Sequence, residues 1–219
     1  MRLVSVNVGL PRELVYKGRT IITGIFKEAV DRRVQLRALN LDGDRQADLS
    51  VHGGPSKAVY VYPVEHYDFW RQELWEAGLA WGAFGENFTT EGLREDDLKI
   101  GDRLQVGSAE VMVTEPRLPC YKLAARFRRD DMIKRFLRSG RTGFYLKVVK
   151  EGEVGRGDSI GLLSRDYGSV TIAELTDVYL HKKNDPTAVG RVLRVKELPE
   201  SWRRYFSEQL DKNVAAESN

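Results

Sequence analysis

RLQVGSAEVMVT, residues 103–114, predicts a β-hairpin near the middle of the chain. Arg103–Val106 and Glu110–Thr114 are short runs rich in apolar and β-branched residues, with the flexible pair Gly107-Ser108 close to their junction. Strands joined by so short a glycine-containing loop pair antiparallel. The hairpin therefore indicates a sheet built from strands that follow one another, rather than from the strand–helix–strand repeats of a parallel sheet.

Further strands and a few helices flank this hairpin. Apolar, aromatic or β-branched runs predict strands at Leu3–Val8, Val34–Leu39, Ala58–Tyr62, Gly143–Val149 and Asp158–Leu163. Helical spacing predicts one helix from Pro63 to Gly78 and shorter helices at Tyr121–Phe127 and Met132–Leu137, the last with Asp130 as N-cap. We therefore expect an α+β fold with a mostly antiparallel, β-barrel-like core.

Residues 169–219 have a different character. Three short helices are predicted at Thr171–Tyr179, Pro186–Val195 and Glu200–Leu210. The segment holds eight basic and eight acidic residues, and a neutral module binds nucleic acid poorly, so small-molecule gating or homodimer contacts are favoured over nucleic acid. The expected parts are a β domain (1–168), a small three-helix subdomain (169–212) and a flexible tail (213–219).

Composition restricts the class of protein. The chain has 219 residues, one cysteine and no apolar run near the roughly 20 residues of a membrane helix. Residues 1–10 lack the charged and then apolar pattern of a secretion signal. We therefore expect a cytoplasmic protein with no membrane partner.

Cys120, the one cysteine, lies in Arg117-Leu118-Pro119-Cys120-Tyr121-Lys122, just after the hairpin. Free cysteine is often a buried apolar residue. Here Arg117, Lys122 and the N-terminus of a predicted helix would stabilise the thiolate, the form that acts as nucleophile or metal ligand. Cys120 is therefore the candidate catalytic and metal-ligating residue.

Positive charge is concentrated after the cysteine. The chain has a formal net charge of +3, yet nine Lys or Arg and two Asp lie between Arg117 and Arg141, a local excess of seven. A charge run alone usually covers a solvated helix face. Because this block begins at Cys120, it predicts anion binding.

Three other segments suit an anionic ligand. His52-Gly53-Gly54-Pro55-Ser56-Lys57 contains two glycines that can expose backbone N–H groups between a histidine and a lysine. Gly85-Glu86-Asn87-Phe88 places polar side chains before a strand, and Lys17, Arg19 and Thr20 place a hydroxyl after two cations. Each pattern alone is also typical of an ordinary turn.

Together these segments, in this order, resemble the MOSC family, named after the C-terminal domain of molybdenum cofactor sulfurase, and within it the YiiM-like bacterial branch. The resemblance rests on four motifs: Gly43–Asp48, His52–Gly54 with Lys57–Tyr60, Gly85–Phe88 and Pro116–Lys122. It covers nearly the whole chain, including the three C-terminal helices that YiiM-like proteins add to a MOSC barrel.

The resemblance implies a molybdenum cofactor, a pterin dithiolene (molybdopterin) that carries a phosphate, with Cys120 as the protein ligand of the metal. Soft thiolates suit such metals, and cations with exposed amides suit phosphate. The residues that would contact the cofactor are Lys17, Arg19, Thr20, His52, Gly53, Gly54, Lys57, Asn87, Arg117 and Lys122. Phosphate or sulfate is expected in the pocket when the cofactor is lost, and pyridoxal phosphate is not expected.

Enzymes similar to this chain reduce N-hydroxylated compounds, including hydroxylaminopurine bases, to amines. Tyr121 and Phe127 are candidates to stack on a planar base, although apolar spacing on a short helix more often reflects core packing. No dinucleotide-binding glycine signature follows a strand, and one cysteine cannot hold an iron–sulfur cluster, so an external reductase or flavoprotein would supply electrons.

Two other hypotheses remain open. In the first, Cys120 holds a persulfide or passes intact cofactor to another protein, so that the chain is a cofactor carrier or sulfur-transfer protein without turnover. In the second, the basic block binds a nucleotide or nucleic acid without any metal, and binding survives removal of the thiol.

Overall fold

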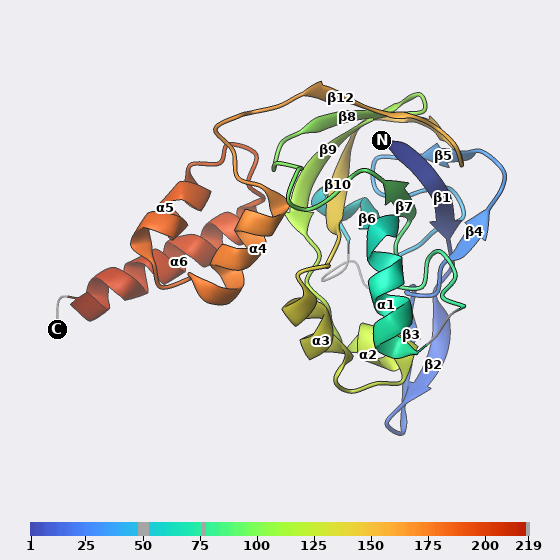
Figure 1. Cartoon of the computed structure of the whole chain (residues 1–219), viewed down its shortest axis with the longest axis horizontal. Coiled ribbons are helices and arrows are strands. Elements are labelled where there is room, and N and C mark those ends of the chain that lie inside the picture. Colours follow the sequence, from blue (N-terminus) through green and yellow to red (C-terminus); the bar gives the residue numbers. More distant parts are fainter. Residues whose placement is uncertain (48–52, 76–77, 218–219) are drawn as a thin grey trace.

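The structure is a computed structural model that describes residues 1–47, 53–75 and 78–217. Its strands are β1 (Arg2–Val8), β2 (Arg12–Tyr16), β3 (Arg19–Thr23), β4 (Glu28–Val30), β5 (Val34–Leu36), β6 (Val59–Pro63), β7 (Phe88–Glu91), β8 (Arg103–Val106), β9 (Ala109–Pro116), β10 (Phe144–Lys150), β11 (Gly152–Val154) and β12 (Ile160–Ser164). Its helices are α1 (Tyr67–Leu74), α2 (Tyr121–Phe127), α3 (Met132–Ser139), α4 (Ile172–His181), α5 (Pro186–Leu193) and α6 (Glu200–Glu217), with 3₁₀ turns η1 (Pro55–Lys57) and η2 (Val64–His66). Figure 1 shows α4, α5 and α6 standing off one end of the strand-rich body.

Eight strands form the main sheet, in the order β12-β8-β9-β10-β6-β7-β1-β4. Neighbours are antiparallel except β6 and β7, which run parallel. The sheet curls until β1 reaches the segment before β12, where the Leu3 N–H donates to the Asp158 carbonyl at 2.9 Å. No ladder joins the edge strands β12 and β4 in the part of the chain that the structure describes. The fold is therefore α+β with a large mixed sheet, and the barrel is not confirmed.

The hairpin expected at residues 103–114 is present as β8 and β9. Arg103 lies opposite Met112 at its open end, and Val106 lies opposite Ala109 next to the turn. Gly107 makes its turn with φ at 55°, and a Cβ there would lie 2.3 Å from the Glu153 carbonyl oxygen. Glycine is therefore the residue that both the backbone angle and the close approach of the neighbouring chain require.

Two apolar clusters stabilise the body. One lines the curled sheet and includes Leu3, Phe88 and Val111, all fully buried. The other is aromatic: Tyr62 of β6 stacks on Phe84 with centroids 4.5 Å apart, and Trp70 of α1 stacks on Phe136 of α3 at 5.5 Å. Stacked rings bury much area in fixed geometry, so this cluster holds α1 and α3 against the sheet.

The three C-terminal helices are confirmed. A capping box starts α4, because the Thr171 hydroxyl accepts from the Glu174 N–H at 3.0 Å and the Glu174 carboxylate accepts in return from the Thr171 N–H at 2.8 Å. Asp185 caps α5. Helix α6 continues through the expected tail as far as Glu217, because no glycine or proline interrupts it, and the flexibility of residues 213–219 stays a prediction.

Several boundaries differ from the sequence prediction. Pro63 ends β6 and η2 follows, so α1 begins only at Tyr67. The helix ends at Leu74, before Trp75 in the left-handed conformation, rather than at Gly78. Asp131, not Asp130, precedes α3. Strands β2, β3, β4 and β11 were not predicted, because they are short and partly polar and are stabilised by pairing partners rather than by their own pattern.

Glu86 is a buried carboxylate that organises the loop before β7. It accepts hydrogen bonds from the Gly82 N–H (2.7 Å), the Phe84 N–H (3.1 Å), the Thr89 hydroxyl (3.0 Å) and the Tyr67 hydroxyl. Burial raises the pKa of Glu86, and these donors oppose that shift by stabilising its charge. One side chain thereby holds the loop, α1 and β7 together.

Replacing Glu86 tests this arrangement. Glu86→Ala leaves buried donors without an acceptor, so we expect the free energy of unfolding in urea to fall by about 3 kcal/mol. The control is Glu91→Ala, which removes an exposed ion pair with Arg2 and should cost less than about 1 kcal/mol. Equal losses would contradict the structural role of Glu86.

Candidate functional site

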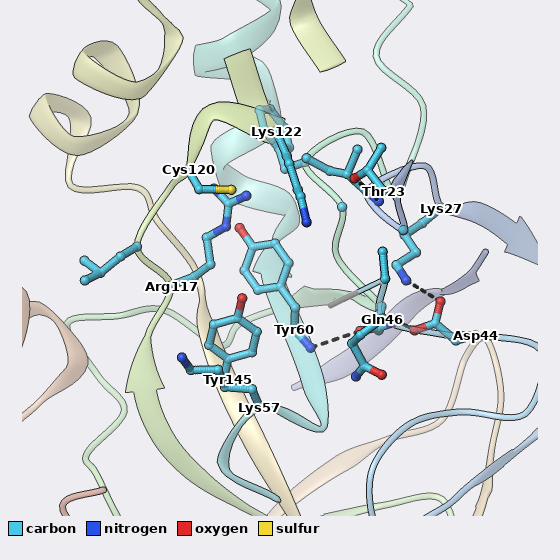
Figure 2. Close-up of a pocket in the computed structure, with 17 residues that line it drawn as sticks. Thr23, Lys27, Asp44, Gln46, Lys57, Tyr60, Arg117, Cys120, Lys122 and Tyr145 are labelled. Carbon is cyan, nitrogen blue, oxygen red and sulfur yellow. Dashed lines mark hydrogen bonds and ion pairs between the residues drawn. The ribbon is translucent and has the colours of Figure 1, made fainter. Parts of the chain in front are cut away.

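A cavity of about 100 Å³ opens beside Cys120, and we call it the cysteine pocket. Figure 2 shows Arg117, Cys120 and Lys122 on one side of it, Lys27 and Asp44 on the other. The full lining is Thr23, Gly24, Ile25, Lys27, Asp44, Gln46, Ala47, Lys57, Tyr60, Phe84, Gly85, Asn87, Arg117, Leu118, Cys120, Lys122 and Tyr145.

Arg117 is a buried cation whose Nη1 has no hydrogen-bond partner among the described residues. Its guanidinium lies over the rings of Tyr60 and Phe136, at 5.3 and 5.2 Å from the ring centroids. Ring faces stabilise the charge only in part, and a buried donor without an acceptor is costly. Arg117 is therefore suited to an anionic ligand that supplies the missing acceptor.

Cys120 lies where the sequence predicted it, at the N-cap of α2 with extended backbone. Its carbonyl accepts from the Leu123 N–H at 2.9 Å, which closes the first turn of the helix. The residue is partly exposed, and it lines the pocket together with Arg117 and Lys122. The thiol is therefore accessible and lies among cations, as a metal-binding cysteine requires.

Lys27 and Asp44 form a buried ion pair on the opposite wall. The two residues are 9% and 6% exposed, and the second Asp44 oxygen accepts from the Asn87 side-chain amide at 2.9 Å. Burial lowers the pKa of Lys27, and the charge of Asp44 opposes that shift. Because Asp44 neutralises Lys27, the cations left to bind an anion in this pocket are those of other lining residues.

Asn87 lines the pocket but is engaged within the protein. Its Oδ1 accepts from the Tyr60 N–H at 3.1 Å, and its Nδ2 donates to Asp44 at 2.9 Å and to the Asn7 carbonyl at 3.3 Å. Both amide hydrogens are thus occupied. The structure gives Asn87 a positioning role, and direct contact with a cofactor stays a prediction.

A second cavity, of about 390 Å³, adjoins the first, and we call it the interdomain cavity. It shares Lys57, Leu118, Cys120 and Tyr145 with the cysteine pocket. The helical subdomain contributes Tyr179 of α4 and Ser201, Trp202 and Tyr205 of α6. Cys120 therefore lies at the junction of two cavities that differ in chemistry.

Glu115 joins the sheet to the helical subdomain at this cavity. The Trp202 indole N–H donates to its Oε2 at 2.7 Å, and the Lys57 Nζ lies 3.8 Å from the same oxygen. Burial raises the pKa of Glu115, whereas the charge of Lys57 and the hydrogen bond from Trp202 lower it. No local sequence pattern indicates this contact, because Lys57, Glu115 and Trp202 lie far apart along the chain.

Five of the predicted site residues are brought together in the cysteine pocket: Lys57, Asn87, Arg117, Cys120 and Lys122. Lys17, Arg19 and Thr20 lie elsewhere, exposed on the β2–β3 hairpin. There the Lys17 Nζ pairs with Asp130 at 2.8 Å.

The glycine loop is only partly described. Gly54 precedes η1 with φ at 89°, and neither Gly53 nor Gly54 is among the residues that line the two cavities. His52 lies outside the described residues. Their contact with a cofactor stays a prediction, as does that of the three hairpin residues.

The pocket residues that sequence reasoning did not assign to the site include Lys27, Asp44, Tyr60 and Tyr145. Asp44 and Tyr60 lie inside motifs on which the family resemblance rests, so a signal for them existed. Tyr145 showed only the alternating pattern of a strand, and Lys27 showed only its place at the end of a β-rich run.

No group of three or more His, Cys, Asp or Glu side chains in residues 1–47, 53–75 and 78–217 is arranged to hold a metal ion. His66 instead contacts Glu95 through Nε2 at 2.7 Å. Cys120 would thus supply a single protein donor, so a metal at this site would need its other donors from a cofactor.

Comparison with known proteins identifies the family. Residues 48–161 match the model of the MOSC domain, and residues 170–213 match that of the YiiM-like, 3-alpha helix domain. The chain therefore belongs to the MOSC-domain family and carries the YiiM-like helical domain after it, which confirms the resemblance seen in the sequence.

Individual relatives agree with this assignment. The protein YflK of Bacillus subtilis is 41% identical over 215 residues, covering 98% of this chain and 97% of its own. A protein named Reductase from Gibberella moniliformis is 38% identical over 157 residues, which are 68% of this chain and 27% of that protein. The crystal structure of YiiM from Geobacillus stearothermophilus matches with a TM-score of 0.80 at 32% identity, covering 95% of this chain and 98% of that one.

Two nearby aspartates test the buried pair. Asp44→Asn leaves Lys27 buried without a counter-charge, so we expect the free energy of unfolding to fall by about 3–5 kcal/mol. Asp42→Asn is the control, because Asp42 pairs with Arg37 at the surface and its loss should cost less than about 1 kcal/mol. Similar urea midpoints for the two variants would show that the pair does not stabilise the pocket wall.

Proposed function

We propose that the junction of the two cavities holds a molybdenum cofactor, anchored by Cys120. The observation that carries the proposal is the orphaned Nη1 of Arg117 in the same pocket as the one cysteine of the chain. A soft thiolate suits molybdenum, and a buried guanidinium suits an anionic oxygen of the pterin phosphate. The donor set therefore fits a group that offers both a metal and a phosphate.

Different lining residues would bind different parts of the cofactor. Cys120 Sγ would ligate the metal, while Arg117, Lys57 and Lys122 would bind anionic oxygens. Lys27 and Asp44 hold the opposite wall in place and stay paired with each other. When bound, the cofactor would supply a two-electron reduction, and the protein would supply orientation and charge.

The proposed reaction is the reduction of an N-hydroxylated compound to its amine. Two electrons and two protons convert N–OH into N–H and water, and the electrons come from a separate reductase or flavoprotein. The name of the relative Reductase supports a reductive reaction. The match covers only 27% of that protein, so most of it lies outside the part that resembles this chain.

Metal content is the first test. Produced in a host that makes the cofactor, the wild type should contain about one molybdenum and one pterin per chain, and Cys120→Ala should contain little of either. Arg138→Met is the control, because Arg138 is exposed on α3 away from the pocket. Negligible metal in the wild type with cofactor in excess would overturn the proposal.

Turnover separates the proposed reductase from a carrier. Loaded wild type, given a chemical or enzymatic electron donor, should convert 6-hydroxylaminopurine to adenine. Bound cofactor without turnover for any donor would favour the carrier or sulfur-transfer hypothesis instead.

Inorganic phosphate tests the anion site without the cofactor. Calorimetry on cofactor-free protein should detect phosphate binding that weakens about tenfold or more in Arg117→Met, because the charge-assisted bonds are lost. The neutral side chain should be tolerated in the buried position, and Arg138→Met should bind as the wild type does. Unchanged affinity in Arg117→Met would place the anion elsewhere.

A further inference from the structure

Glu115 is a buried carboxyl group in the lining of the interdomain cavity. It lies near the end of β9 and is 4% exposed. The Trp202 indole N–H donates to its Oε2 at 2.7 Å, and the Lys57 Nζ lies 3.8 Å from the same oxygen. Because both donors approach Oε2, a proton on this carboxyl group resides on Oε1.

The size of the two cavities indicates which of them receives a substrate. The interdomain cavity, at about 390 Å³, lies within the range of small-molecule sites, whereas the cysteine pocket, at about 100 Å³, does not. Cys120 borders both cavities, so a substrate in the larger one can reach a cofactor anchored at the thiol. Glu115 lines the cavity in which that substrate would lie.

The surroundings of Glu115 suit a group that changes its protonation state during a reaction. Burial raises the pKa of Glu115, which favours the protonated form, whereas Lys57 and Trp202 oppose that shift by stabilising the carboxylate. A general acid must hold a proton before the reaction and carry a negative charge after it. Burial meets the first requirement, and the two donors on Oε2 meet the second.

We propose that Glu115 is the general acid of the reduction and donates a proton from Oε1 to the hydroxyl oxygen of the N-hydroxylated substrate. The N–O bond breaks, and the oxygen leaves with the bonding electron pair and this proton as water. Two electrons from the external reductase, passed on through the cofactor, go to the nitrogen, which takes the second proton from solvent. The Glu115 carboxylate then pairs with Lys57 until solvent returns its proton. The proposal rests on the proposed function for the reaction and adds the proton donor.

Glu115 is favoured over the other titratable groups around the cavity, which are Lys57 of η1, Cys120, Tyr145 of β10, Tyr179 of α4 and Tyr205 of α6. Tyr145 lies opposite Glu115 in the strand register, and burial raises its pKa from an ordinary value of 10.0. A general acid is most efficient when its pKa lies near the working pH. Burial therefore moves the carboxyl group toward neutral pH and the phenol away from it.

Glu115→Gln removes the acidic proton and keeps both the shape of the side chain and an acceptor for Trp202. We expect kcat of the loaded enzyme for 6-hydroxylaminopurine, with reduced methyl viologen as electron donor, to fall about a hundredfold or more. KM and the molybdenum content should stay at the wild-type values. Glu110→Gln is the control on the same strand, because Glu110 pairs with Arg103 outside the cavity, and it should keep the wild-type kcat.

The pH profile of kcat separates a proton donor from a residue that only supports the fold. Wild-type kcat should fall as the pH rises through the pKa of Glu115, and Glu115→Gln should lack this fall. Trp202→Phe keeps a ring but removes a hydrogen bond that stabilises the carboxylate, so the pKa rises and the fall should move to higher pH. Trp75→Phe changes an exposed ring outside the cavity and should leave the profile unchanged.

Protonation of Glu115 can also be measured without the cofactor. In cofactor-free protein, the infrared carbonyl band of a protonated carboxyl group should disappear as the pH rises. The difference between wild type and Glu115→Gln isolates the band of Glu115 from those of other carboxyl groups. Trp202→Phe should move this titration to higher pH, as it moves the profile of kcat.

These outcomes distinguish the proton donor from the reductase. Wild-type kcat in Glu115→Gln, or an unchanged pH profile in Trp202→Phe, would overturn the role of Glu115 and leave the reductase intact. A wild type whose infrared difference shows no titrating band would overturn it as well, whatever the metal content. A wild type that contains molybdenum but never turns over would refute the reductase, and the role of Glu115 with it.

Discussion

The side chain of Asn87 is the constraint on which the site depends. The parallel pair β6–β7 and the antiparallel pair β1–β7 begin at the same place, and there the main chain of Asn87 bonds to Tyr60 (2.8 Å) and Asn7 (2.7 Å). Its amide bonds to the same two residues and also to Asp44. Asn87 thereby joins β1, β6 and β7 to the loop that carries Asp44, so the pocket wall and the mixed sheet form together.

Much of the fold could be predicted from local pattern, and the remainder could not for a common reason. The β8–β9 hairpin and the C-terminal helices carry their own signals, in turn residues, periodicity and caps. Strand β11 (GEV) carries none, because it is stabilised by pairing with β5, more than a hundred residues earlier. The barrel-like core is not confirmed, and the reason is similar: the order and closure of a sheet depend on long-range pairing, which residue types alone do not encode.

The site follows the same division. Cys120, Arg117 and Lys122 lie within six residues of one another, so the sequence alone could place them together, and the structure agrees. Lys17 looked equivalent as a cation, yet its hairpin carries it to the surface beside Asp130. Glu115 could not be found, because its role comes from contacts with residues on η1 and α6 that meet it only in the folded chain.

The buried charged groups of the protein differ in how completely other residues satisfy them. Lys27 has a carboxylate partner and serves the wall, whereas Arg117 is held by ring faces and keeps an unsatisfied donor. Glu115 is held by one indole and one ammonium group on a single oxygen. A buried charge that is paired with a fitting partner contributes structure, and one left incompletely satisfied costs stability that a ligand can restore. The cavity on the side of Arg117 is therefore suited to an anion.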